Sequence, residues 1–261
     1  MRITRFVVSI AALAAFAAPA SLAPAREAAA QGAPRMEARP DTAQRTPRDR
    51  GPTRPQGPPP PIHVLYLIRH GMYDYTDPAD ERIGRHLDSL GRVQAKLVGA
   101  RLASLPVKAD RLVSSNFTRA METADLIGER MHLAPSRDSL IRECSPTSVN
   151  PNFRFDYPGE GDSSVAQLER AWAKYATKPG DKDSYDVLVC HGNVIRWFAC
   201  KALGVDTRNW LNMDVGNGSI TAIVVRADGM TRLATLSDTG HLPIEAQTWT
   251  GRGAGWVPVR R

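Results

Sequence analysis

The sequence predicts an α/β fold, a three-layer α/β/α sandwich built on a mainly parallel sheet. Short apolar segments rich in β-forming residues alternate along the chain with longer segments whose apolar residues repeat at helical spacing. A helix between two strands implies a crossover connection, and crossovers place parallel strands in one sheet with helices on both faces. Open sheets of this kind bind ligands at the carboxyl ends of their strands, so we expect the catalytic site there.

The first strand is expected at residues 63–68, because the uninterrupted run HVLYLI is typical of a strand buried on both faces. Helices are expected where apolar residues lie three and four positions apart, as Val93 and Leu97 do, and Val98 and Leu102. The alternation continues with strands at 111–114, 138–141 (short) and 186–190, and with helices at 91–105, 118–131, 163–176 and 194–203. Two final strands, 219–226 and 231–237, flank the turn sequence ADGM and predict a hairpin.

Composition divides the chain into three regions. Residues 1–30 place two Arg before a 13-residue apolar run and then small residues, the order typical of a secretory signal peptide. That run is shorter than the roughly 20 residues that span a bilayer. Residues 31–61 contain nine prolines and predict a disordered linker. Residues 62–261 form the catalytic domain. We therefore expect an exported protein, periplasmic or secreted, with no stable membrane insertion after cleavage.

The net charge of +7 does not indicate a nucleic-acid partner. Nine Arg and four acidic residues give residues 1–62 a charge of +5, so the remainder is nearly neutral. It also lacks the basic–aromatic stripes that bind nucleic acid. The three cysteines, Cys144, Cys190 and Cys200, have neither C-x-x-C pairing nor zinc-site spacing. We expect them to behave as small buried hydrophobic residues. Three cysteines also permit one disulfide bond, which the sequence does not require.

Five chemically active side chains follow the predicted strands. Arg69 and His70 come directly after the first strand, and His191 follows the strand at 186–190. Arg119 opens the helix after the strand at 111–114, and Glu143 follows the short strand at 138–141. Each of these residues alone would be an ordinary turn or surface residue. Their common position at the strand ends is the specific signal, because those ends share one edge of the sheet.

The cationic members of this set suit a phosphate ester. A phosphomonoester is a dianion, so its site needs fixed positive charge around the non-bridging oxygens. Arg69 and Arg119 can supply that charge through forked donors whose geometry matches phosphate. His191 adds a donor at the N-terminus of a helix, and Asn193, two residues later, is also expected to bind substrate.

The remaining two residues suit covalent catalysis. A neutral imidazole at His70 can attack phosphorus and form a transient phosphohistidine. Glu143 can protonate the leaving alkoxide and later accept a proton from the attacking water. We expect neither a cofactor nor a metal ion, because the arginines and His191 already neutralise the phosphate charge.

Four segments of the chain resemble the histidine phosphatase superfamily, the phosphoglycerate-mutase-like proteins. They are LIRHG (67–71), LDSLGRVQA (87–95), SSNFTRAMETA (114–124) and CHGNVIR (190–196). NGSIT (217–221) and DTG (238–240) further resemble the mitochondrial serine/threonine protein phosphatases of that superfamily. The resemblance implies the same roles for the five residues: His70 as nucleophile, Glu143 as proton donor, and Arg69, Arg119 and His191 as the phosphate pocket. Asp88 stands where the family usually has Thr or Ser, and either can cap the following helix.

The substrate remains open between phosphoserine or phosphothreonine proteins and small phosphate esters, and a homodimer is compatible with the sequence. Two alternative functions remain. The spacing of Cys190 and Arg196 is that of cysteine-dependent phosphatases, and a non-catalytic phosphate- or partner-binding protein would keep the same fold. The segment 144–162 is expected to be a lid that sets specificity. It carries Phe153, Arg154, Phe155 and Tyr157 among Pro and Gly residues.

Overall fold

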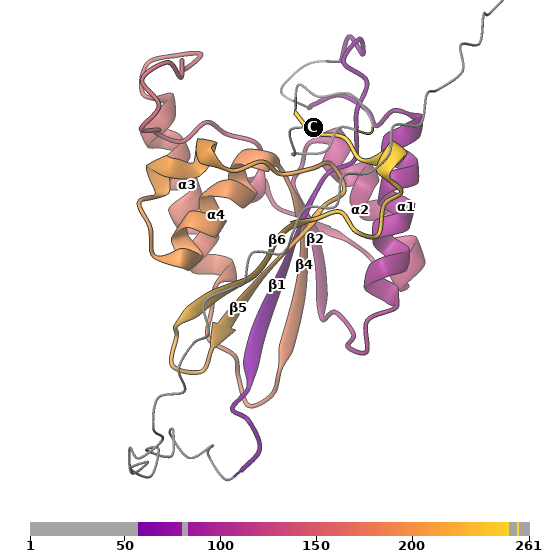
Figure 1. The fold of residues 1–261 in the computed structure, drawn as a ribbon, viewed down its shortest axis with the longest axis vertical. Helices are drawn as coiled ribbons and strands as arrows, with labels where there is room; N and C mark the ends of the chain where they lie inside the picture. The colour runs from indigo at the N-terminus through magenta and orange to yellow at the C-terminus, as the bar shows by residue number, and fades with distance from the viewer. Residues whose placement is uncertain (1–56, 80–82, 251–254, 256–261) are drawn as a thin grey trace, which may run out of the picture. The chain divides into compact units, whose positions relative to one another are not determined.

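The computed structural model describes residues 57–79, 83–250 and 255. The predicted signal peptide, and the predicted linker apart from residues 57–61, lie outside this part of the chain. Within it, one sheet has the strand order β3-β2-β4-β1-β5-β6 (Figure 1). The strands are β1 (Ile62–Arg69), β2 (Arg111–Ser114), β3 (Ser136–Arg137), β4 (Ser184–Cys190), β5 (Ile220–Arg226) and β6 (Thr231–Asp238). The α-helices are α1 (Ser89–Ala103), α2 (Thr118–Met131), α3 (Glu160–Tyr175) and α4 (Gly192–Leu203).

The sheet is mainly parallel, as predicted. β1 pairs in parallel with β4, with Arg69 opposite Cys190, and β2 pairs in parallel with β4 and β3. The predicted hairpin forms β5 and β6, and β5 runs antiparallel to β1. The carboxyl ends of β1, β2 and β4 therefore meet at one edge.

Helices cover both faces of the sheet, which confirms the three-layer prediction. α1 and α2 lie on one face, and α3 and α4 lie on the other (Figure 1). Alternate residues of the strands enter two separate cores. Ile68, Val187 and Val189 pack in the α1/α2 core, whereas Leu67 and Leu188 pack in the α3/α4 core. This two-sided burial explains why the central strands have continuous apolar sequences.

One predicted strand is wrong. Residues Ser139–Ile141 form a short 3-10 helix, and the strand β3 lies just before it. The cause is Asp138, whose side chain accepts a hydrogen bond from the Leu140 backbone N–H at 2.9 Å. A local bond of this kind favours a turn over extended backbone. Glu143 therefore follows a 3-10 turn and not a strand.

The connection from β1 to α1 passes very close to the start of α1. A Cβ atom on Gly91 would lie 1.8 Å from the Met72 carbonyl oxygen, and one on Gly71 would lie 2.4 Å from the Gly91 carbonyl oxygen. Only glycine permits this approach. Asp88 caps the helix, since its side chain accepts from Gly91 N–H at 2.6 Å. The loop after His70 is thus fixed to the first turn of α1.

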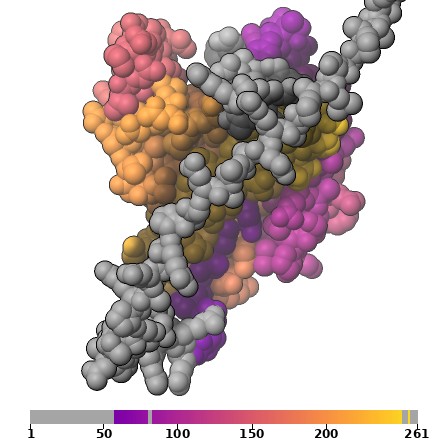
Figure 2. Space-filling model, viewed as in Figure 1, coloured from indigo at the N-terminus to yellow at the C-terminus, as the bar shows by residue number. Residues whose placement is uncertain are grey.

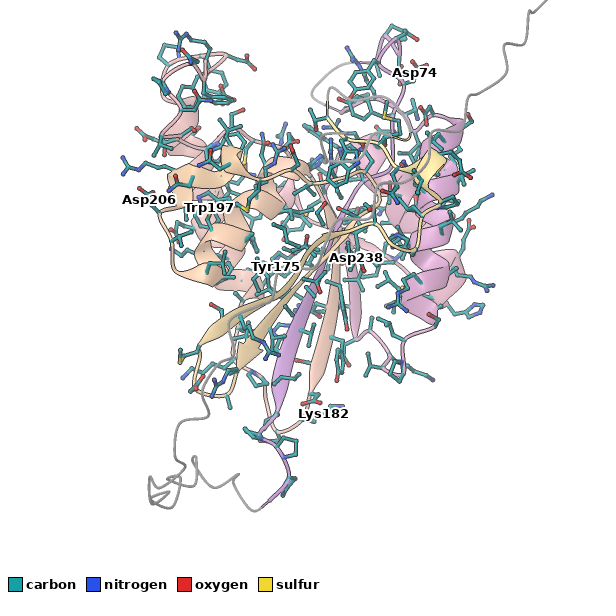
Figure 3. All side chains as sticks on the ribbon, viewed as in Figure 1. Asp74, Tyr175, Lys182, Trp197, Asp206 and Asp238 are labelled. Atoms are coloured by element: carbon teal, nitrogen blue, oxygen red, sulfur yellow. The ribbon has the colours of Figure 1, made fainter. Side chains whose placement is uncertain are left out.

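A charged cluster joins the opposite, amino-terminal ends of β1 and β4. His63 Nε2 lies 2.9 Å from Asp186 Oδ2, and His63 Nδ1 lies 3.0 Å from the Thr177 carbonyl oxygen. Arg111 Nε donates to Asp186 Oδ1 at 2.9 Å. Both His63 and Asp186 are buried. Figure 3 shows how far apart the two ends lie, with Asp74, four residues after His70, at one end and Lys182, two residues before β4, at the other.

Candidate active site

His70 is buried at the carboxyl end of β1, with one ring nitrogen available for chemistry. Its Nδ1 lies 2.8 Å from the Gly71 carbonyl oxygen, which can only accept, so Nδ1 carries the proton. Nε2 therefore presents its lone pair, and Arg119 Nε donates to it at 3.1 Å. Burial lowers the pKa of His70 well below its ordinary value, and the charges of Arg119, His191 and Arg69 lower it further. The imidazole is neutral, as a nucleophile requires.

The backbone around His70 is held from three other elements. His70 N–H donates to the Cys190 carbonyl on β4 at 3.1 Å. The His70 carbonyl accepts from the Asn217 side chain at 3.2 Å, just before β5. The next residue, Gly71, donates its N–H to Thr123 Oγ1 on α2 at 3.0 Å. These bonds fix the nucleophile before any substrate arrives.

Two buried arginines provide the positive charge at His70. Arg69 donates from Nη1 to the Val215 carbonyl at 2.5 Å, and its Nε has no hydrogen-bond partner among the described residues. Burial lowers the pKa of Arg69 to about 10, so it stays protonated at neutral pH. Arg119 lies over the rings of Tyr73 and Phe117, each 5.0 Å from its guanidinium carbon. Both guanidiniums are thus held in place with donor capacity to spare.

His191, the N-cap residue of α4, lies beside His70, with ring centroids 5.1 Å apart. Its Nε2 lies 2.8 Å from Ser115 Oγ, which also accepts from Phe117 N–H at 3.2 Å. The Ser115 hydroxyl can therefore donate its proton to Nε2, and in that tautomer the ring proton is on Nδ1. No described residue hydrogen-bonds that Nδ1. Burial, with Arg119, Arg69 and Arg142, lowers the pKa of His191 well below its ordinary value.

Glu143 lies across the site from His70. Its Oε2 is 4.0 Å from His191 Nδ1, and its Oε1 is inaccessible and without a hydrogen-bond partner in the described part of the chain. Burial raises the pKa of Glu143, against the opposing charges of Arg119, Arg69 and Arg196. A carboxyl group that keeps its proton to higher pH is suited to protonating a leaving group.

The side chain of Asn193, which was expected to bind substrate, hydrogen-bonds other groups of the protein. Its Nδ2 donates to the Cys144 carbonyl at 3.0 Å, and its Oδ1 accepts from Arg196 at 3.3 Å. The structure thus brings the other five predicted residues around one point and places Asn193 behind them.

A cleft of about 280 Å³ leads to this point. Its lining comes from two segments on either side, one after β1 and one before α3, together with the start of α2. The lining residues are Tyr73, Gly84, Arg85, Phe117, Arg119, Glu143, Cys144, Ser145, Asp156 and Glu160. In the space-filling view the two segments, purple and pink, stand out on the same side of the domain (Figure 2). The segment 144–162 therefore forms one wall of the cleft.

The predicted lid is anchored along its first half, where Trp210 Nε1 donates to the Pro146 and Thr147 carbonyls at 3.1 Å. Phe153 packs against Trp210 with ring centroids 5.3 Å apart, and Arg154 donates to the Pro151 carbonyl at 2.7 Å. Phe155 and Tyr157, in contrast, are 41% and 57% exposed. These two aromatic rings are available to a bound partner.

Several residues that support the site were not predicted. Arg142 lies 4.9 Å from the Phe117 ring, and Gln94 accepts from Met72 N–H at 2.7 Å. Gln94 had a detectable signal, because it is a polar residue on the same helical stripe as the buried Val98 and Leu102. Within the described residues, no group of three or more His, Cys, Asp or Glu side chains could hold a metal ion. Metal independence stays a prediction.

The family model of the histidine phosphatase superfamily (branch 1) matches residues 65–239. The chain belongs to the histidine phosphatase superfamily. The solved phosphoglycerate mutase of Plasmodium falciparum is 26% identical and has a TM-score of 0.50, with coverage of 70% of this chain and 95% of that one. The predicted fold class is confirmed, and membership of this superfamily supports the predicted hydrolysis of phosphate esters.

The curated relatives include mitochondrial serine/threonine-protein phosphatases named PGAM5. The Rattus norvegicus protein is 38% identical over 185 residues, which are 69% of this chain and 64% of the relative. The Caenorhabditis briggsae protein is 39% identical over 68% of this chain and 64% of the relative. The chain thus spans less than two thirds of the length of these relatives. The predicted similarity to this branch is confirmed.

The prediction of export is wrong. The relatives from rat, human and Caenorhabditis briggsae are named as mitochondrial proteins, not as periplasmic or secreted ones. Residues 1–30, predicted as a signal peptide, lie outside the described residues. Their composition did not discriminate, because mitochondrial targeting segments are also rich in Arg and poor in acids, and no acidic residue precedes Glu27. In the described part of the chain, no helix is long and apolar enough to cross a membrane.

Proposed function

We propose that this histidine phosphatase removes phosphate from phosphoserine or phosphothreonine in protein substrates, with His70 as nucleophile and Glu143 as proton donor. The observation that carries the proposal is the pair of protonation states at the site. His70 keeps Nε2 unprotonated next to a guanidinium, while burial favours the protonated form of Glu143. Burial thus moves both groups toward the uncharged forms that nucleophilic attack and proton donation require.

The first step forms the phosphoenzyme. The substrate dianion replaces His70 as the partner of Arg119, and its non-bridging oxygens accept from Arg69, Arg119 and the free Nδ1–H of His191. The Nε2 lone pair attacks phosphorus, the bond to the leaving oxygen breaks, and Glu143 gives its proton to that oxygen.

The second step restores the enzyme. A water molecule attacks phosphorus in line with the N–P bond and transfers a proton to the Glu143 carboxylate. The electron pair of the N–P bond returns to His70, and inorganic phosphate leaves. Glu143 is again protonated and His70 again neutral, so one turnover consumes one water and balances its protons.

Protein substrates are favoured by the surface around the cleft. Four large hydrophobic side chains on its two walls are exposed to solvent: Tyr75 (48%), Ile83 (57%), Phe155 (41%) and Tyr157 (57%). A small phosphate ester inside the cleft cannot reach all of them, whereas a polypeptide that carries the phosphate can cover them. The relatives' name, serine/threonine-protein phosphatase, supports the same substrate class.

Trapping of the phosphoenzyme tests the proposal. The purified protein is mixed rapidly with a radiolabelled phosphothreonine peptide and quenched in alkali, which preserves a phosphoramidate. Label is expected on the peptide that contains His70, and EDTA in every solution should leave turnover unchanged. Label on another residue, or turnover that EDTA abolishes and a divalent ion restores, would contradict the mechanism.

The structure gives no support to the two alternatives. Burial raises the pKa of the Cys190 thiol, and its side chain lies in the α3/α4 core, so it is neither ionised nor accessible. A non-catalytic binding protein has no need for a buried neutral imidazole with an unprotonated Nε2 in the same site as a carboxyl group of raised pKa.

A further inference from the structure

No side chain in the described part of the chain donates a hydrogen bond to the Glu143 carboxyl group. Oε1 lacks a hydrogen-bond partner among the described residues, and Oε2 comes no closer than 4.0 Å to His191 Nδ1. The carboxyl group does receive a hydrogen bond from the Cys144 backbone, which lowers its pKa against the larger effect of burial. The residue also lies outside regular secondary structure, between a 3-10 turn and the wall of the cleft. Its position must therefore come from the backbone on either side of it.

Two amide side chains hold that backbone. Gln167 on α3 donates from Nε2 to the Arg142 carbonyl at 3.0 Å and to the Leu140 carbonyl at 3.1 Å. Asn193 on α4 donates from Nδ2 to the Cys144 carbonyl at 3.0 Å. The carbonyl before Glu143 and the carbonyl after it are thus bound from two different helices.

The second amide is itself oriented by charge. Arg196, one turn later on α4, donates from Nη1 to Asn193 Oδ1 at 3.3 Å, which directs the NH₂ group of Asn193 toward Cys144. Arg196 Nη2 lies 3.7 Å from Asp214 Oδ1. A chain of contacts therefore runs from Asp214 through Arg196 and Asn193 to the backbone next to Glu143.

We propose that Gln167 and Asn193 form an amide clamp that positions Glu143 for proton transfer, with Arg196 orienting Asn193. They are positioning residues, because neither lines the cleft. The reason for a clamp is geometric: a general acid acts only within hydrogen-bond reach of the leaving oxygen, and a shift of about 1 Å is enough to remove much of its effect. This inference rests on the proposed role of Glu143.

The test uses two substrates that differ in their need for an acid. A phosphothreonine peptide releases an alkoxide, which must be protonated, whereas p-nitrophenyl phosphate releases an anion that is stable by itself. In Gln167→Met and Asn193→Leu, which remove the donor and keep a similar shape, kcat/KM for the peptide is expected to fall by about tenfold or more. For p-nitrophenyl phosphate it should stay within about twofold of the unmodified protein.

Three further variants make the result decisive. Asn212→Leu removes an exposed amide at the end of the 3-10 helix Thr207–Asn212 and should leave both substrates unchanged. Asn193→Ser removes the same donor with less bulk if Asn193→Leu does not fold. Glu143→Gln shows whether the acid itself discriminates between the substrates.

The outcomes separate the two proposals. If Glu143→Gln slows only the peptide but the clamp variants slow both substrates equally or neither, the clamp is wrong and the role of Glu143 stands. If Glu143→Gln does not discriminate, the proposed function of Glu143 fails. Selective loss in Glu143→Gln and in both clamp variants supports the clamp.

Discussion

A buried histidine lies at each end of the β1–β4 pairing, His63 at the amino end and His70 just after the carboxyl end of β1, and their pKa values are shifted in opposite directions. At the amino end, His63 lies between the Asp186 carboxylate and the Thr177 carbonyl, so both ring nitrogens must donate. Its hydrogen bond to Asp186 raises the pKa of His63. At the carboxyl end, burial and then Arg119 lower the pKa of His70.

The comparison shows that burial alone does not decide the charge of a histidine. Both rings are nearly inaccessible, and burial lowers the pKa of each. Acceptors around His63 outweigh that effect, whereas cations around His70 add to it. A buried imidazolium paired with a carboxylate ties two strands together. A buried neutral imidazole among arginines can instead attack an anionic substrate that the arginines bind.

The largest expected effect is on turnover. His70→Ala should lower kcat by at least about 10³-fold, because no neighbouring group can attack phosphorus in its place. The free energy of unfolding should fall by about 1–3 kcal/mol, the cost of truncating a buried ring that packs against Tyr73 and His191. Steady-state kinetics with a phosphopeptide and urea unfolding measure the two quantities. Turnover that persists in His70→Ala would show that His70 is not the nucleophile.

The opposite pattern is expected at the amino end. Asp186→Asn leaves the His63 imidazolium buried without its counter-charge and should cost about 3–5 kcal/mol of unfolding free energy. Turnover per folded molecule should stay unchanged, because the cleft lies at the other end of the strands. Urea unfolding measures the loss of unfolding free energy, and active-site titration combined with steady-state kinetics measures the turnover per folded molecule. Asp228→Asn, which breaks the exposed ion pair with Arg226, is the control and should stay within about 0.5 kcal/mol.

The two ends should also give opposite pH dependences. An unfolded histidine has a pKa of about 6.5. Above that pH the unfolded chain has lost its proton while folded His63 keeps it, so the unfolding free energy falls as pH rises through the folded pKa of His63. Below that pH the histidines of the unfolded chain bind protons, whereas folded His70 and His191 stay neutral because their pKa values are lowered. The free energy of unfolding therefore falls as the pH decreases.

Urea unfolding between about pH 5.5 and 8.5 measures these slopes, and two variants assign them. His63→Gln should flatten the alkaline side, and His70→Gln should flatten part of the acid side. The half-buried His241, whose pKa is also lowered, adds to the acid side. The exposed His86, whose pKa is raised, adds weakly to the alkaline side. Equal slopes in His63→Gln and the unmodified protein would mean that His63 is neutral.

The order of the elements could be predicted because hydrophobic periodicity is local, and β2 and α2 have the predicted bounds. The starts of α1 and α3 could not be predicted from apolar spacing. α1 begins at Ser89 because Asp88 caps it, and α3 begins at Glu160 with a polar first turn that has no apolar repeat. The turn at Ser139–Ile141 depends on one Asp138 hydrogen bond, which composition does not reveal.

The residues of the site could be predicted from the strand ends, but their protonation could not. The tautomer of His70 depends on the Gly71 carbonyl, and its pKa depends on Arg119, 49 positions away. Asn193 shows the same limit. The sequence places it beside His191, but only the structure shows that its amide bonds the Cys144 carbonyl instead of facing the cleft.

The smallest expected effect is at Cys190, which lies on β4 between the two clusters. Its backbone carbonyl accepts from His70 N–H, so the residue touches the catalytic end, but its side chain is buried in the apolar core. Burial raises the pKa of the thiol, which excludes a thiolate at neutral pH. Cys190→Ser replaces a small apolar group with a hydroxyl and should cost about 1 kcal/mol of unfolding free energy. Turnover per folded molecule should stay within about twofold, because the backbone contact is unchanged. Two results together would instead identify the Cys190 thiol as the nucleophile: a loss of turnover of about 10³-fold in Cys190→Ser, and substrate-derived label on Cys190 in the unmodified protein. His70 would then be a neutral member of the phosphate pocket, like His191.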